Sequence, residues 1–139
     1  MSEQVQTAIA VIGALKANAT LTALLTTYAA SPAVFTHVPQ DLQSYPYIVL
    51  FDSGMDSENN DSYLGFEGVF NLHSWTDQRD MAVIGNIQKA IYDVLNHAEL
   101  TMTGYDVPEI HQEFSTILRD PDGITLHGVQ RYKILIKSN

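Results

Sequence analysis

The chain has 139 residues, the size of one ordinary domain, and we expect a single domain over residues 1–139. Sixteen acidic and seven basic side chains give a net charge of -9, which argues against a dedicated nucleic-acid binder but not against DNA that passes nearby. The absence of cysteine excludes disulfides and thiolate metal sites. No apolar stretch has the length of a membrane span or signal peptide, so we expect a soluble protein, without a membrane partner, made in the cytoplasm.

Helical patterns come first along the chain. Residues 5–17 carry apolar side chains at three- and four-residue steps, which predicts an amphipathic helix. A second, short helix is expected from Thr20, a plausible N-cap, and Ser31-Pro32 ends the helical region. The expected buried stripe of the first helix is Val5, Ala8, Ile9, Ile12 and Leu15.

Strands follow, with one more helix among them. A short strand is expected at 34–37, an apolar interior strand at 45–51 and a half-buried, alternating strand at 64–73. Between the last two, residues 52–61 have the composition of a polar, acidic loop. A helix capped by Thr76 or Asp77 comes next. Its expected buried stripe is Met81, Ile84, Ile87, Ile91, Val94 and Leu95.

The carboxyl-terminal third predicts strands at 100–102, 110–119 and 124–137. The last two are joined by a Pro-Gly turn at residues 120–123. On the final strand, alternation directs Tyr132, Ile134 and Ile136 to the core and leaves a basic stripe on the other side. We therefore predict an α+β fold: a mostly antiparallel mixed β-sheet with two α-helices packed on one face.

The sequence contains no recognisable catalytic motif. The five histidines lack metal-ligand spacing, and the acidic segment lacks the pattern of a calcium-binding EF-hand loop. No nucleophile, phosphate-binding or dinucleotide motif is present. We expect no catalytic residue, no metal site and no cofactor. His73 and His127 lie on predicted strands and could meet in space, so a small metal-dependent hydrolase built around them stays an alternative.

Four stretches resemble the tail completion, or tail terminator, proteins of siphophages and prophages. They occur in that family's order and span about residues 8 to 135. They are residues 38–40 (VPQ) with 45–49 (YPYIV), 72–76 (LHSWT), 90–104 (AIYDVLNHAELTMTG) and 119–132 (RDPDGITLHGVQRY). The last is the most specific.

The resemblance implies a virion protein that caps the tail tube as a ring, usually a hexamer, at its head-proximal end. Such a ring stops tube polymerisation and joins tail to head. Its partners would be further copies of itself, the tail tube protein and the head connector or neck protein, and DNA would pass through its lumen without specific binding. The family has no catalytic residues to carry over.

Two surfaces are candidates for these roles. An acidic lumen lining would repel DNA phosphates; its residues would be Asp52, Asp56, Glu58 and Asp61. A subunit or tube interface would be formed by Arg119, Asp120, Asp122, Arg131, Lys133 and Lys137, of which the three last-strand bases could equally be a solvated face. A head-side neck or connector completion protein and a monomeric ligand-binding domain remain alternative functions.

Overall fold

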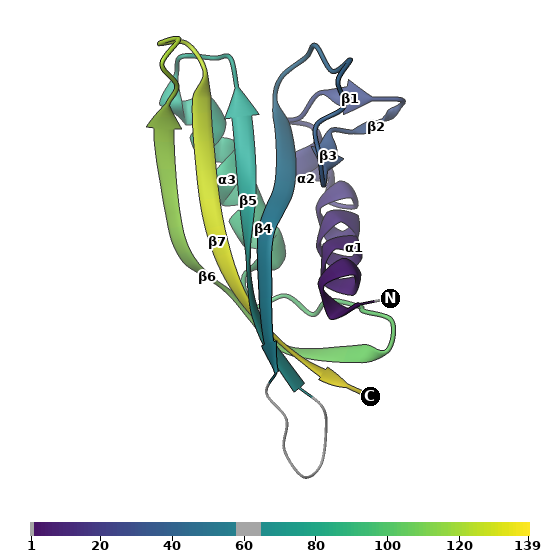
Figure 1. Cartoon of the computed structure of the whole chain (residues 1–139). Coiled ribbons are helices and arrows are strands. Elements are labelled where there is room, and N and C mark those ends of the chain that lie inside the picture. The colour runs from purple at the N-terminus through teal and green to yellow at the C-terminus, as the bar shows by residue number, and fades with distance from the viewer. Residues whose placement is uncertain (1, 58–64) are drawn as a thin grey trace.

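A five-stranded sheet in the order β3-β4-β5-β7-β6 organises the computed structural model, which describes residues 2–57 and 65–139 (Figure 1). Its strands are β3 (Val34–Phe35), β4 (Tyr47–Ser57), β5 (Gly65–Thr76), β6 (Tyr105–Arg119) and β7 (Leu126–Ser138). The helices are α1 (Glu3–Lys16), α2 (Ala19–Thr22) and α3 (Met81–Leu95), and β1 (Thr27–Tyr28) pairs with β2 (Ser31–Pro32) in a separate small sheet. Only β3 and β4 pair in parallel within the five-stranded sheet, which confirms the α+β prediction.

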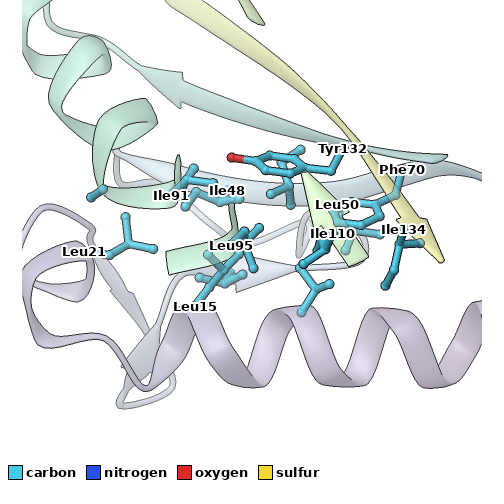
Figure 2. Close-up of a cluster of buried hydrophobic side chains, with 14 of the residues drawn as sticks. Leu15, Leu21, Ile48, Leu50, Phe70, Ile91, Leu95, Ile110, Tyr132 and Ile134 are labelled. Atoms are coloured by element: carbon cyan, nitrogen blue, oxygen red, sulfur yellow. The ribbon is translucent and has the colours of Figure 1, made fainter. Parts of the chain in front are cut away.

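The helices cover one face of the sheet. Helix α1 packs against β3 and β4, and α3 packs against β5, β7 and β6. The core lies between the layers, where Phe70 of β5 stacks on Tyr132 of β7 at 5.6 Å (Figure 2). We call the opposite face of the sheet the open face. Within the described part of the chain, no helix is long and apolar enough to cross a bilayer.

The two longer helices begin and face differently from the prediction. In α1 the buried side chains are Thr7, Val11 and Leu15, so of the predicted stripe only Leu15 is buried, while Val5 and Ile9 are exposed. The α3 stripe is largely correct, although Met81 is exposed and Ala90 replaces it in the buried set. The N-caps were wrong. They are Asn18 for α2 and Asp80 for α3, whose side-chain oxygens accept hydrogen bonds from backbone N–H groups in the first helical turn.

Two strand predictions also change. Residues 52–57, predicted as loop, continue β4, and a bulge between Phe51 and Gly54 shifts its register against β5. Residues 100–102 form no strand beyond an isolated bridge from Met102 to Tyr105, and β6 begins earlier than expected, at Tyr105. The alternation of β7 is as predicted, with Tyr132, Ile134 and Ile136 buried.

A buried polar network joins α3 to the sheet. Gln130 Nε2 donates to the Gln88 carbonyl at 3.0 Å and to Gln112 Oε1 at 2.9 Å, and Tyr132 Oη donates to the same Gln112 oxygen at 3.3 Å. Gln88 Nε2 donates in turn to the Thr116 carbonyl at 3.0 Å. Burial is the main cause that raises the pKa of Tyr132. The network fixes how the helix layer lies over β6 and β7, because each buried donor would be costly to leave unpaired.

Candidate functional site: an aromatic cluster on the open face

One row of side chains crosses the open face over four strands. Residues directly opposite each other in a sheet share a face, and Tyr47 of β4 lies opposite Trp75 of β5. Trp75 lies opposite His127 of β7, and His127 lies opposite Leu118 of β6. The next row along the strands contains His73. Four strands, distant in sequence, therefore bring an aromatic cluster to one end of the open face.

The rings of this cluster pack face against face. Trp75 and His127 stack with centroids 3.7 Å apart and planes 11° apart. Tyr47 stacks on the other side of Trp75 at 6.5 Å, and Tyr45 follows at 5.4 Å from Tyr47. Tyr45 is 38% exposed, and Trp75, between its neighbours, is half-buried. The cluster is therefore a flat, rigid, largely apolar surface with a phenol at its border, which is the composition of a contact surface.

His73 and His127 meet as the sequence allowed. His73 Nδ1 and His127 Nε2 are 2.7 Å apart and share a hydrogen bond, in which one nitrogen donates and the other accepts. Two nitrogens bound to one zinc ion lie about 3.3 Å apart, since each sits about 2.0–2.1 Å from the metal. Across residues 2–57 and 65–139, no three acidic or histidine side chains gather closely enough to hold a metal. The pair's arrangement is that of a hydrogen bond within a packed surface.

The cluster also shifts two pKa values. Burial, followed by the neighbouring His73, lowers the pKa of His127, while Asp120 opposes that shift. Burial, followed by Tyr45 and Asp120, raises the pKa of Tyr47. Both groups are held neutral near pH 7. Tyr47 and His127 therefore add no charge to the cluster near pH 7, and Asp120 is the carboxylate that acts on both.

Three of the four stretches singled out in the sequence contribute to this one place. Tyr45 and Tyr47 come from the first, His73 and Trp75 from the second, and His127 from the last. Sequence reasoning did not select Tyr45, Tyr47 or Trp75 as site residues. The signal was available, because these stretches place aromatic or histidine side chains on strands, but their meeting depends on the order of strands in the sheet.

The predicted basic stripe does lie on the open face, away from the aromatic cluster. Lys133 forms an ion pair with Glu67 of the same chain. Arg131 is exposed, and its Nε donates to Asn71 Oδ1 at 3.5 Å. Lys137 lies opposite Gly65 and Asp106. Lys133 therefore already meets an acid within the chain, whereas Arg131 is presented to solvent.

The hairpin-turn residues have local roles. Asp122 Oδ1 accepts from the N–H groups of Ile124 and Thr125, each at 2.9 Å, and Oδ2 accepts from Thr125 Oγ1 at 2.7 Å. These bonds lower the pKa of Asp122, and Gly123 takes the positive φ of 73° that the turn needs. Arg119 Nη1 reaches the Gly123 carbonyl at 3.5 Å. Asp122 is thus occupied in holding the turn, while Asp120 acts on the aromatic cluster.

Of the predicted acidic lining, only part can be located. Asp56 lies on β4, exposed and opposite Glu67 of β5. The backbone of Asp52 also belongs to β4 rather than to a loop. Glu58 and Asp61 lie outside the described residues. That the four acids form one lining therefore stays a prediction.

Comparison with known proteins identifies the family. The family model described as tail completion protein gp17 matches residues 9–137. The chain belongs to this family. The tail completion protein gp17 of Bacillus phage SPP1 is 23% identical over 104 residues, which cover 75% of this chain and 77% of that protein. A chain from the virion of a native gene transfer agent particle shares the fold, with a TM-score of 0.84 at 19% identity over 99% of this chain and all of that one.

Membership of the tail completion family confirms the resemblance seen in the sequence. The matched region contains every residue of the aromatic cluster and nearly all of the sheet. The chain is accordingly a phage tail completion protein by family.

Proposed function

We propose that this tail completion protein is a non-catalytic part of the virion that closes the head-proximal end of the tail tube as a ring. It stops tube polymerisation and joins the tail to the head. Family membership over residues 9–137 is the observation that carries the proposal. It is assembled in the host cytoplasm, and its partners are its own copies, the tail tube protein and a head connector or neck protein.

The aromatic cluster is the surface that we assign to a partner in the virion. Its rings are stacked, and three neighbouring strands carry most of them, so little conformational entropy is lost when a partner covers them. The turn at residues 120–123 borders it through Asp120. Rigid aromatic surfaces with a polar border are typical of binding hot spots.

The acidic residues Asp52, Asp56, Glu58 and Asp61 remain our candidates for a lumen lining. Carboxylates on the inner wall of a ring repel DNA phosphates and let the genome slide past without being bound. Asp56 is exposed on the open face at the end of β4, where a ring could present it to its lumen. A ring structure with this segment on the outer rim would contradict this assignment.

The direct experiment is native mass spectrometry of the purified chain, with and without tail tubes that lack their terminator. We expect a closed ring, either free or formed only on the tubes, and tubes that no longer elongate. A monomer that ignores tubes but binds heads would instead support the head-side connector role. A monomer that binds neither would reject both assignments.

A matched pair of surface variants tests the aromatic cluster. Tyr45→Ser removes the exposed ring at the border of the cluster, and Met81→Ser removes a similarly exposed side chain at the start of α3. We expect Tyr45→Ser to weaken capping of tubes or joining to heads at least about tenfold, because exposed aromatic anchors carry much of the free energy of an interface. Met81→Ser should leave both unchanged. Equal behaviour of the two variants would remove the cluster from the contact.

A further inference from the structure

Two exposed apolar surfaces lie at opposite edges of the molecule. On α1, which packs beside β3 and β4, Val5 is 45% and Ile9 is 53% exposed, and we call these two residues with Gly13 the α1 ridge. Strand β6 forms the other edge of the sheet (Figure 1). On β6, Phe114 is 57% and Leu118 is 51% exposed, and we call these two the β6 patch. Large apolar side chains gathered in this way mark interaction sites more often than scattered ones do.

The two surfaces also face opposite ways. Helix α1 lies on the helix-covered face, with Val11 and Leu15 in the core beneath it. Phe114 lies opposite Arg131 and Leu118 lies opposite His127, which places both on the open face. Patches that differ in edge and in face cannot meet within one molecule. They can meet between successive copies arranged head to tail, where every copy uses both surfaces once.

The α1 ridge is bordered by grooves that can receive protruding side chains. One, of about 640 Å³, is lined by Val5, Ile9, Gly13 and Thr36. A second, of about 350 Å³, lies on the other side of the ridge and is lined by Ile9, Gly13 and Glu99. Gly13 lies between the two, and nothing approaches within 4 Å of where its Cβ would be. The ridge is therefore open, whereas the β6 patch projects.

Charge favours contact between unlike surfaces over contact between like ones. Exposed Arg131 is the register partner of Phe114, and exposed Glu99 lines a groove beside Ile9. Two β6 patches together would oppose arginines, and two α1 ridges would oppose glutamates. Glu3 and Lys16, at the two ends of α1, balance each other. With a net charge of -9, copies repel unless such a specific contact offsets the repulsion.

We propose that the β6 patch of one subunit seats on the α1 ridge of the next copy, with Arg131 facing Glu99 across the contact. Around the ring, the helix layer of each subunit then overlaps the edge of its neighbour's open face. This inference rests on the proposed ring and names the surfaces that close it. The contact buries side chains that are costly to leave in water, without changing the fold of either subunit.

The chain has no cysteine, so introduced cysteines report the contact without background. Ile9→Cys and Phe114→Cys, made as separate single-cysteine chains and mixed, are treated with a short thiol cross-linker in the presence of tubes that lack a terminator. We expect mixed 9–114 dimers in large excess over 9–9 and 114–114 dimers. Gln40→Cys, in an exposed loop, replaces Ile9→Cys in the control mixture and should yield at least about tenfold less cross-link to residue 114.

The outcomes separate this inference from the ring itself. Rings on tubes with 9–114 links support both. Rings that form normally but link only like positions, or no more than the Gln40→Cys control, overturn the proposed contact and leave the ring standing. Failure to assemble on tubes, seen with the unmodified chain, overturns the ring and this inference with it.

A charge exchange gives a second, independent test. Arg131→Glu and Glu99→Arg should each reduce the fraction of subunits in rings, because each opposes like charges across the contact. The double variant should recover much of the lost fraction. Two single losses that simply multiply in the double variant would overturn the pairing of Arg131 with Glu99. Circular dichroism of each variant, which changes only exposed side chains, checks that the fold is retained.

Discussion

Truncating two residues of β6 to alanine separates the core of this protein from its exposed surface. Ile110 is fully buried against the helix layer, whereas Phe114, four residues later on the same strand, is more than half exposed. We expect Ile110→Ala to destabilise the isolated chain strongly and Phe114→Ala to do so weakly. Both residues lie on β6 but on opposite faces of the sheet, so the comparison reports burial.

The expected sizes follow from that burial. Truncating a fully buried isoleucine to alanine costs about 2–5 kcal/mol, which includes the cavity left behind. A phenylalanine that keeps more than half its surface in water should lose about 1 kcal/mol or less on truncation, which is typical of surface changes. For a domain of this size, a loss of 1 kcal/mol lowers the melting temperature by about 3–4 °C. Ile110→Ala should therefore melt about 10 °C lower, and Phe114→Ala within a few degrees of the parent.

Urea denaturation of the monomeric chain, followed by tryptophan fluorescence, measures both free energies of unfolding. The sequence has one tryptophan, Trp75, which lies on the sheet and so reports its unfolding. An equal loss in the two variants would refute the reasoning, because Phe114 would then be packed inside the subunit. The β6 patch would in that case not be a surface offered to another copy.

Three further predictions concern single sites. Gly68→Ala should lower the free energy of unfolding by about 1–3 kcal/mol, since the added Cβ would lie 2.8 Å from a backbone carbonyl oxygen. Gly85→Ala, with open space around it on α3, should raise the free energy of unfolding by about 0.5–1 kcal/mol in the same denaturation assay. Because the folded state lowers the pKa of His127, the free energy of unfolding should fall as pH drops through about 6.5, where the unfolded chain takes up the proton. His127→Phe, which keeps a flat ring beside Trp75, should lose that pH dependence. An unchanged pH dependence in the variant would assign it to another group. Asp122→Ala should lower the melting temperature at neutral pH. The difference in melting temperature from the parent should shrink as pH falls below about 4, since the stabilisation by the Asp122 carboxylate is present above its pKa in the unfolded chain and is lost on protonation. A difference that does not change with pH would contradict this account.

Alternation was a better guide than helical spacing in this sequence. The buried positions of β7 follow period two along nearly the whole strand, because successive side chains of a strand point to opposite faces of the sheet. Helix α1 has apolar residues on more than one side, so spacing could not tell which side meets the sheet. The packed side contains Thr7. Its hydroxyl donates a hydrogen bond to the Glu3 carbonyl at 2.7 Å, so the side chain tolerates burial. Because this side packs on the sheet, Val5 and Ile9 of the predicted stripe are left exposed.

The candidate site depended on topology that local patterns do not carry. His73 and His127 are 54 residues apart and meet because β5 and β7 are neighbours, with α3 and β6 between them in sequence. The extension of β4 through residues 52–57 was missed for a related reason. Polar, glycine-containing residues there are held in a strand by pairing with β5 across a bulge, which overrides their low strand propensity.

The layout of the open face explains why its contact points lie at its borders. Trp75 stacks on His127 on one side and on Tyr47 on the other, and His127 shares a hydrogen bond with His73. The rings in the middle of the cluster therefore already contact one another. Exposed apolar area remains where the rows end, at Tyr45 beyond β4 and at Leu118 on β6. A partner gains most by covering those ends, since a larger fraction of each side chain is exposed there than at half-buried Trp75 or His127. With Leu118 assigned to the next subunit, Tyr45 is the end left for the tube or the head, and for this reason it is the side chain to change first.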